Sequence, residues 1–360
     1  MKFEKRKLMK KSHILIITIL FGLMVVLSAC VPGPRVTGSP GVTISDDDVF
    51  VAYRSFVYRL DASSGSVDWH FPEEGSNQVV FYSQPLVTED YVYVGDLANN
   101  FHKIDIETGE GQWTFSESNG FFVGQAAEKD GIVYAPSDDG NLYAIDENGN
   151  LIWSFKTGHF LWSQPKITDD AIYVGSMDHS VYALTHDGEE IWSVEMAGAV
   201  VGSPALSEDG STLFAGSIGN DFIALDTNNG EQRWSFQTED SIWGSPALAN
   251  DLLYLADVGG NLYALDPESG EPSLQTEFDG SAVGGITVLA DGIVLATEQG
   301  VIKSFNFDGS PTWEATLAGE IFQEPVANDE HLVVATINGE NLVYAFNLSG
   351  VQLWSTTPEN

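Results

Sequence analysis

The sequence predicts an all-β fold made of eight consecutive repeats, each containing four short antiparallel strands. Three observations support this prediction. A tryptophan recurs at a spacing of about forty residues, short runs of alternating apolar and polar side chains are separated by Gly, Asn and Asp, and no segment after Cys30 keeps a helical period. A repeat of this length is typical of stacked repeat arrays and of propellers.

The first residues have the features of a secretory signal peptide. Residues 1–13 carry six Lys and Arg side chains, and the apolar segment 14–27 is shorter than the roughly 20 residues that span a bilayer. The segment ends in LSAC at residues 27–30, which resembles the lipobox of bacterial lipoproteins. This resemblance implies cleavage before Cys30 and lipid attachment to its thiol, so that the mature chain stays anchored to a membrane.

These features divide the chain into three parts. We expect residues 1–29 to form the leader, residues 30–39 to contain the lipidated Cys30 and a flexible Pro- and Gly-rich linker, and residues 40–360 to form one repeat domain. Val31 stands where an aspartate retains many lipoproteins at the inner membrane. The expected location is the extracytoplasmic cell envelope, either the outer membrane facing the periplasm or the outer face of the plasma membrane.

The charge of the chain excludes some partners. Residues 1–29 contain six of the 15 Lys and Arg and one of the 52 Asp and Glu, so their removal leaves 9 basic and 51 acidic side chains and a net charge of −42. A surface this acidic is repelled by nucleic acids and by anionic lipid headgroups. We therefore expect no nucleic-acid partner, and attachment to the membrane through the lipid anchor alone.

The repeats share a phrase of the type Ala-x-Asp, in which alanine or the acid is replaced in some copies, followed by a turn with glycine and then a strand that carries tryptophan in seven of the eight. The carboxylate is expected to accept hydrogen bonds from amides of the turn, and the small alanine is expected to admit a tryptophan at the seam between repeats. We interpret these residues as structural. Leu274 replaces the tryptophan of the sixth repeat. The tryptophans are Trp69, Trp113, Trp153, Trp192, Trp234, Trp313 and Trp354, and the turn acids are Asp61, Asp105, Asp146, Asp226 and Asp266.

This phrase resembles the tryptophan-docking repeat of the PQQ-like β-propellers, a family that includes quinoprotein alcohol dehydrogenases and the outer-membrane assembly lipoprotein BamB. The resemblance extends over residues 40–354. It implies an eight-bladed β-propeller whose four-stranded antiparallel blades surround a central channel. The turn before the glycine is long in repeats 1, 2, 5 and 6 and short in the others, as expected of a duplicated four-repeat half.

A second regularity points to a candidate binding site. The residue three positions before the proline of each first strand is aromatic in the even repeats and small in the odd ones, and in a propeller this position surrounds the channel mouth. The aromatic residues either fill the channel as core or form a concave site for an apolar ligand, a sugar or a peptide segment. The aromatic residues are Tyr82, Trp162, Trp243 and Phe322, and the small residues are Thr37, Val123, Val201 and Val283.

Acidic turns are expected on the same face as these aromatic residues, where a cationic partner, a peptide or a calcium ion would bind. The acids in question are Asp96, Asp138, Asp139, Asp178 and Asp257.

The histidines occur singly in the sequence and are expected at the surface, and no metal site is predicted. The sequence also lacks a phosphate-binding loop and a nucleophile elbow, so it predicts no catalytic residues.

The resemblance leaves three functions open. The main expectation is a non-catalytic, monomeric propeller that binds other envelope proteins, as BamB does when it assists insertion of outer-membrane β-barrels. One alternative is a quinone-binding enzyme similar to the PQQ-dependent dehydrogenases, which hold PQQ above calcium and close the pocket with adjacent cysteines. Because Cys30 is the single cysteine, we expect no cofactor. The other alternative is an extracellular propeller that senses a ligand.

Overall fold

In every repeat, four consecutive strands pair with their neighbours in chain order. The computed structural model describes residues 39–76 and 78–358, and within these residues each repeat forms its own four-stranded antiparallel meander. The predicted all-β, eight-bladed propeller is confirmed, and the described residues contain no helix. The leader, Cys30 and Thr37 lie outside the described residues. None of the described segments is a helix long and apolar enough to cross a membrane.

Each of the first four blades contains four consecutive strands. They are β1 (Gly41–Ser45), β2 (Asp48–Tyr53), β3 (Phe56–Asp61), β4 (Val67–Phe71), β5 (Leu86–Val87), β6 (Tyr91–Gly95), β7 (Phe101–Asp105), β8 (Gly111–Phe115), β9 (Ala127–Lys129), β10 (Ile132–Pro136), β11 (Asn141–Ile145), β12 (Leu151–Lys156), β13 (Lys166–Ile167), β14 (Ile172–Gly175), β15 (Ser180–Leu184) and β16 (Glu190–Glu195).

The last four blades repeat the same order. Their strands are β17 (Ala205–Leu206), β18 (Thr212–Gly216), β19 (Asp221–Asp226), β20 (Gln232–Gln237), β21 (Ala247–Ala249), β22 (Leu252–Ala256), β23 (Asn261–Leu265), β24 (Pro272–Glu277), β25 (Thr287–Leu289), β26 (Gly292–Ala296), β27 (Val301–Asn306), β28 (Pro311–Thr316), β29 (Val326–Ala327), β30 (His331–Ala335), β31 (Val343–Asn347) and β32 (Gln352–Thr356).

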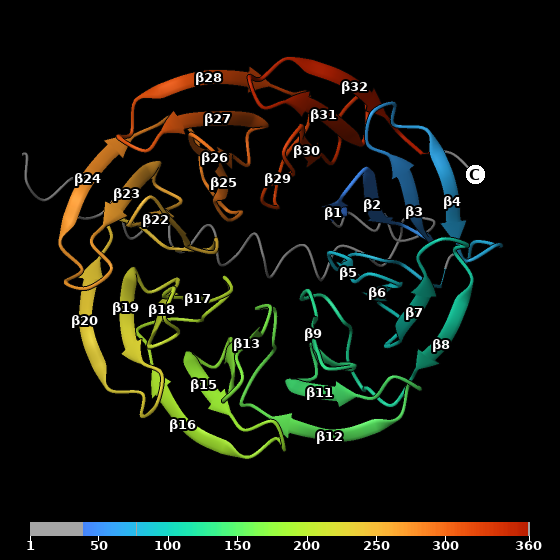
Figure 1. Cartoon of the computed structure of the whole chain (residues 1–360), viewed down its shortest axis with the longest axis horizontal. Coiled ribbons are helices and arrows are strands. Elements are labelled where there is room, and N and C mark those ends of the chain that lie inside the picture. The colour runs from blue at the N-terminus through green and yellow to red at the C-terminus, as the bar shows by residue number, and fades with distance from the viewer. Residues whose placement is uncertain (1–38, 77, 359–360) are drawn as a thin grey trace, which may run out of the picture. The chain divides into compact units, whose positions relative to one another are not determined.

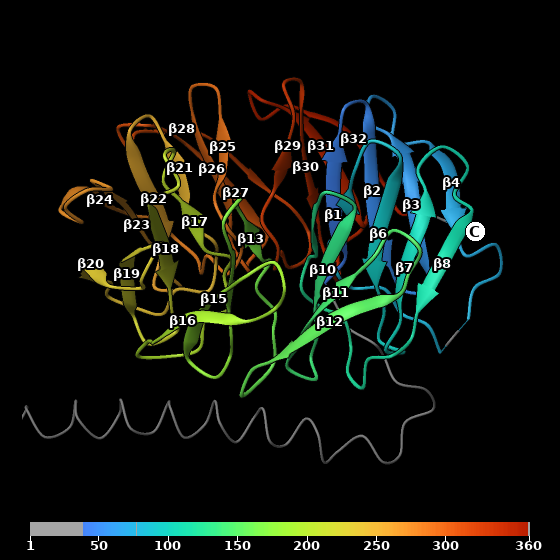
Figure 2. The same cartoon turned by 60° about the horizontal axis from the view of Figure 1, so that its bottom comes forward.

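The blades stand around a central channel like the sectors of a ring. Figure 1 shows the first strand of each blade nearest the centre and the fourth strand at the rim, and Figure 2 shows the blades side by side. The second and third strands are buried on both faces because each lies between two neighbouring blades, as in the fully buried core of β18. Rim strands such as β20 alternate exposed and covered residues, since one of their faces meets water.

The repeat tryptophans join each blade to the next. Within its own blade, Trp153 pairs across the strands with Ala144, and the register shifts directly after this pair. Its indole Nε1 then donates a hydrogen bond of 2.8 Å to the carbonyl oxygen of His186 in the following blade. The indole also covers Gly188, where φ is +83° and an added Cβ would lie 2.6 Å from the ring. The small alanine and the glycine therefore hold the indole from both sides.

The same indole hydrogen bond is made at seven of the eight seams. The donor and acceptor pairs are Trp69 to Ile106, Trp113 to Glu147, Trp153 to His186, Trp192 to Thr227, Trp234 to Pro267, Trp313 to Leu348 and Trp354 to Ala62. At the remaining seam, Leu274 packs against Gly309 without a side-chain donor of its own. Seven equivalent bonds plus this apolar contact connect the eight blades.

The turn acids organise the loop that carries each docking carbonyl. Oδ1 of Asp105 accepts hydrogen bonds from the amides of Glu107 and Thr108 at 3.1 and 2.9 Å, and these bonds lower the pKa of Asp105. The four corresponding acids also accept amide hydrogen bonds in their turns: Asp61, Asp146, Asp226 and Asp266. Each acid thus fixes a turn whose backbone receives the tryptophan of the preceding blade.

Candidate functional site

One face of the ring carries both the turns between second and third strands and the segments that enter the first strands. The amide of Asp138 in such a turn donates to the carbonyl of Phe121 at 2.7 Å, and the amide of Met177 donates to Phe160 at 3.0 Å. Phe121 and Phe160 precede the predicted mouth residues Val123 and Trp162 by two positions. We call this face, with its turns 96–100, 137–141, 176–180 and 257–261 and the segments 119–125 and 158–164, the mouth face.

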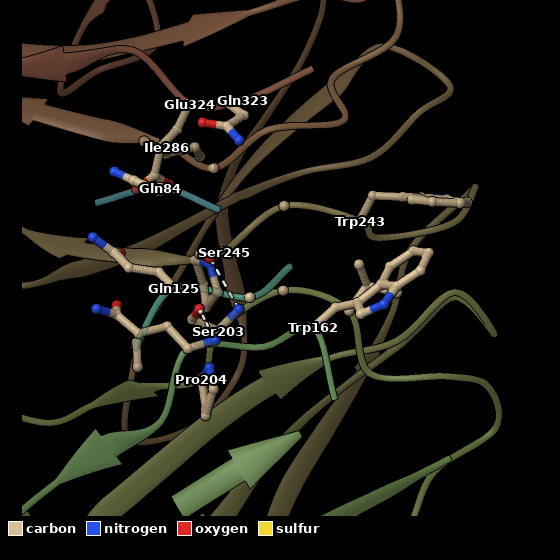
Figure 3. Close-up of a pocket in the computed structure, with 18 of the residues that line it drawn as sticks. Gln84, Gln125, Trp162, Ser203, Pro204, Trp243, Ser245, Ile286, Gln323 and Glu324 are labelled. Atoms are coloured by element: carbon tan, nitrogen blue, oxygen red, sulfur yellow. Dashed lines mark hydrogen bonds between the residues drawn. The ribbon is translucent and has the colours of Figure 1, made fainter. Parts of the chain in front are cut away.

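A cavity of about 550 Å³ opens at the channel on this face. Two of the four predicted aromatic residues, Trp162 and Trp243, line it, and Figure 3 shows their indoles on the same side of the cavity. Tyr82 and Phe322 are not among the lining residues. The small residues of the odd blades also line the cavity, namely Val123, Val201 and Val283. Of the four predicted aromatic residues, the two indoles therefore line this cavity, on one side of it.

The two indoles differ in their surroundings. Nε1 of Trp162 donates to Oδ1 of Asp138 at 3.2 Å, and its ring lies nearly parallel to that of Phe160 at a centroid distance of 6.4 Å. Trp243 remains 39% exposed. Trp162 is thus held in place by its neighbours, whereas Trp243 presents apolar surface to the channel mouth.

The acids of the mouth turns are mostly occupied by their own turns, contrary to the expectation that they face a partner. Asp96 and Asp257 are fully buried. Asp96 accepts the amides of Ala98 and Asn100 at 2.7 and 2.8 Å. Asp257 accepts the amide of Asn261 at 3.0 Å. A carboxylate that is buried away from water needs hydrogen-bond donors of this kind. These two acids therefore stabilise their turns and do not expose their charge to a binding partner.

Tyrosines of the third strands donate hydrogen bonds to two other acids of the mouth turns, Asp139 and Asp178. The hydroxyl of Tyr143 donates to Asp139 at 2.6 Å, and the corresponding bond from Tyr182 to Asp178 is 2.8 Å long. Burial raises the pKa of Asp139, but the bonds from Tyr143 and nearby amides outweigh it and bring the pKa to about 2. Burial and the same carboxylate raise the pKa of Tyr143 to about 12. Asp139 and Tyr143 therefore behave as a fixed polar pair.

The expectation that the histidines lie at the surface is wrong for two of them. His102 is buried, with 7% of its surface exposed, and its Nε2 lies 3.0 Å from Oδ2 of Asp96. His331 is buried as well, at 8% exposure. A signal was available for His102, because it occupies the third-strand position that holds tyrosine in other blades, such as Tyr143 and Tyr182.

Polar side chains form a layer below the indoles that the sequence analysis did not identify. They occupy the position directly before each first-strand proline or its equivalent: Gln84, Gln125, Gln164, Ser203, Ser245, Gly285 and Glu324 line the cavity. The amide of Gln164 donates to Oγ of Ser203, and the amide of Ser203 donates to Oγ of Ser245, both at 3.0 Å. The signal was available, since this position is polar or glycine in every blade.

Two residues bring full charges into this cavity. Glu324 belongs to the polar layer of the eighth blade, and Lys166 lies on the first strand of the fourth blade. Burial raises the pKa of Glu324, an effect that Lys166 opposes, and burial lowers the pKa of Lys166, an effect that Glu324 opposes. Both side chains line the cavity, and each favours the charged form of the other against the effect of burial.

The described residues do not fit the quinone and calcium site of the PQQ-dependent dehydrogenases. They contain no group of three His, Cys, Asp or Glu side chains that could hold a metal ion. Calcium requires six to eight oxygen ligands, including carboxylates. The cavity offers only one carboxylate among its lining residues, that of Glu324.

Solved structures share the fold at low sequence identity. BamB from Moraxella catarrhalis superposes with a TM-score of 0.73 and 16% identity, over 85% of this chain and 96% of that chain. A computationally designed protein, Ika8, superposes with a TM-score of 0.76 and 13% identity, over 88% of this chain and 98% of that chain. At such identity these likenesses show the fold alone.

Curated relatives and a family model define the relationship further. The outer membrane protein assembly factor BamB of Nitrosomonas eutropha is 30% identical over 107 residues, which cover 29% of this chain and 26% of that protein. The BamB of Burkholderia pseudomallei is 30% identical over 105 residues, which cover 29% and 27%. The chain thus matches about a quarter of the length of these relatives.

The family model matches a far larger part of the chain. It is described as outer membrane protein assembly factor BamB, and it matches residues 27–128, 117–205, 178–277 and 260–360. These overlapping segments span the predicted repeats from the first to the last. The chain therefore belongs to the BamB family of PQQ-like β-propeller proteins.

Proposed function

We propose that this protein is a non-catalytic scaffold of the cell envelope that binds other envelope proteins through its mouth face. In a host with an outer membrane, its role is the assembly of outer-membrane proteins, as the names of its relatives state for them. The proposal includes a lipid anchor at Cys30 and a monomeric propeller. Family membership across the repeats is the observation that carries it.

The apolar surface of the mouth face supports a protein partner. Phe121 and Phe160 are 41% and 37% exposed, and Trp243 is 39% exposed. Exposed aromatic side chains are enriched in protein interfaces, where they contribute much of the binding free energy. The acidic surface adds selectivity for a segment that combines apolar with basic side chains.

A pull-down from native envelope extract tests this proposal. Full-length lipidated protein is used as bait, together with a variant that carries both Phe121→Ser and Phe160→Ser. The matched control carries Ile152→Ser and Ile191→Ser, which alter two rim residues of similar exposure, 48% and 44%. We expect the wild type and the rim variant to recover the same envelope proteins, and the mouth-face variant to lose them while keeping its melting temperature.

Two results would contradict the proposal. If the mouth-face variant recovers the same proteins as the wild type, the docking surface lies elsewhere. If the purified protein oxidises alcohols in a dye-linked assay after loading with PQQ and calcium, it is an enzyme and the scaffold role fails.

A further inference from the structure

Two side chains of opposite charge, Lys166 and Glu324, line the central channel at positions where the other repeats have neutral residues. At the position of Glu324, the other blades have serine, glutamine or glycine. At the position of Lys166, directly after the proline, they have glycine, alanine, leucine, threonine or valine. Each charge is thus a single departure from a neutral layer. An ordinary channel core gains nothing from burying either charge.

The two charged residues come from opposite sides of the ring. Lys166 begins the first strand of the fourth blade and Glu324 lies just before that of the eighth, so three blades lie between them in either direction. Figure 1 shows β13 and β29 facing each other across the channel. The two side chains line the same cavity and affect each other's pKa, yet no ion pair within 4.0 Å joins these two described residues. Neither makes a hydrogen bond to a described residue.

The side chain of Glu324 occupies space at the cavity that a glycine leaves free. Its carboxylate leans over Gly285, where a Cβ would lie 1.9 Å from Oε2. Any other residue at this position would push the carboxylate away. Oε1 of the adjacent Gln323, which also lines the cavity, is buried and has no hydrogen-bond partner among the described residues. Figure 3 shows both residues on the side of the cavity away from the indoles.

We propose that the channel binds a short peptide with free termini, of two or three residues. Its ammonium group pairs with Glu324, its carboxylate pairs with Lys166, and its side chains contact Trp162 and Trp243 at the mouth. The cavity volume of about 550 Å³ lies in the range of small-molecule sites. The peptide shares Trp243 with the docking surface proposed above, but its termini pair with two charged side chains that the protein docking does not use.

The geometry favours a peptide over a free amino acid. The charges of an amino acid sit on one carbon, whereas Lys166 and Glu324 enter the cavity from opposite blades of the ring. An extended peptide adds about 3.3 to 3.6 Å per residue, so its two terminal charges can reach groups on opposite sides of a cavity. The unmet charges of the cavity also select against ligands that carry only one terminal charge.

Calorimetric titration of the full-length protein in detergent tests the site. The probes are the dipeptide Leu-Leu, N-acetyl-Leu-Leu, Leu-Leu amide and free leucine. We expect saturable one-to-one binding of Leu-Leu and at least tenfold weaker binding of the other three. The Glu324→Gln variant should lose the preference for a free amino terminus, and the Lys166→Met variant should lose the preference for a free carboxylate.

Two exposed residues provide matched controls. Lys129→Met removes a lysine that pairs with Asp169 at 2.7 Å outside the cavity, and Glu330→Gln removes an exposed acid of the eighth blade. Both controls should bind Leu-Leu like the wild type, and melting curves of all variants verify folding. The proposal fails if Leu-Leu does not bind at millimolar concentration. It also fails if folded Glu324→Gln and Lys166→Met proteins keep the wild-type preference for free termini.

Discussion

The indole of Trp354 donates a hydrogen bond of 2.7 Å to the carbonyl oxygen of Ala62, 292 residues earlier in the chain. This contact joins the last blade to the first. The same indole lies over Gly65, where an added Cβ would be 2.6 Å from the ring and φ is +70°. The ring therefore closes through the same docking contact that connects its internal seams, with no strand exchanged between the first and last blades.

We expect Trp354→Ala to lower the free energy of unfolding by about 3 kcal/mol, because it removes a large packed side chain and the hydrogen bond that closes the ring. Urea unfolding followed by circular dichroism measures the change. Leu353→Ala alters the neighbouring residue, which is 47% exposed, and should change the stability by less than about 0.5 kcal/mol. Equal losses for both variants would show that closure does not depend on the indole.

The seam without a tryptophan has a different donor. The hydroxyl of Tyr254 donates to the carbonyl oxygen of Phe307 at 2.8 Å, and this carbonyl occupies the place that accepts an indole elsewhere. In the fourth blade, the corresponding Tyr173 lies 3.4 Å from the carbonyl of Thr227, which also accepts the indole of Trp192 at 3.0 Å. At the seam after the sixth blade, Tyr254 donates to the Phe307 carbonyl without a neighbouring indole. At the seam after the fourth blade, Tyr173 and Trp192 share the Thr227 carbonyl.

This difference predicts unequal effects of the same substitution. Tyr254→Phe should destabilise the protein by about 1 to 2 kcal/mol, because it leaves the Phe307 carbonyl without its donor. Tyr173→Phe should cost less than about 0.5 kcal/mol, since the Trp192 indole keeps the Thr227 carbonyl satisfied. Parallel urea titrations of the two variants measure both values. The interpretation fails if Tyr173→Phe is the more damaging change.

The repeats could be predicted from the sequence because their signals are local. The Trp153 position, the alanine opposite it and the turn glycine recur at fixed offsets, and the turn glycine needs positive φ wherever it occurs. The role of Tyr254 could not be predicted in the same way. Its hydroxyl reaches a carbonyl in the next blade, and nothing in the sixth repeat alone indicates that the hydroxyl replaces a missing indole.

The candidate site was predicted in part for a similar reason. Trp162 and Trp243 could be predicted as mouth residues because aromatic residues alternate along the repeats. The side of the channel on which the cavity forms depends on how the eight blades converge, and the repeat pattern does not specify this. Lys166 and Glu324 are visible as departures from the repeat only when the first strands are aligned. Their shared cavity follows from the ring, which places the fourth and eighth blades opposite each other.

The predicted lipid anchor has its own test. In a bacterial host that processes lipoproteins, we expect the mature chain to begin at Cys30 and to carry lipid on its thiol. Mass spectrometry of the purified protein measures this mass, and Cys30→Ala should retain the uncleaved leader without added lipid. A wild-type chain with an unmodified Cys30 would contradict the anchor, while leaving the propeller and its channel unaffected.

The pair formed by Tyr143 and Asp139 predicts a pH-dependent contribution to stability. The pKa of Asp139 falls from an ordinary value of 3.8 to about 2 in the folded protein. The folded state therefore holds this proton more weakly than the unfolded state, so the pair stabilises the fold above pH 3.8 and loses its effect as the pH falls toward about 2.

Tyr143→Phe removes the 2.6 Å hydrogen bond to the carboxylate of Asp139 and should cost about 1.5 to 3 kcal/mol of stability at neutral pH. The difference between wild type and variant should shrink below pH 3.8, whereas Tyr134→Phe, whose hydroxyl has only a 3.4 Å contact with His186, should show no such acid dependence. Urea unfolding of the three proteins from neutral pH down to pH 2.5 measures both trends, and a Tyr143→Phe deficit that stays constant over this range would show that Tyr143 stabilises the blade by packing alone.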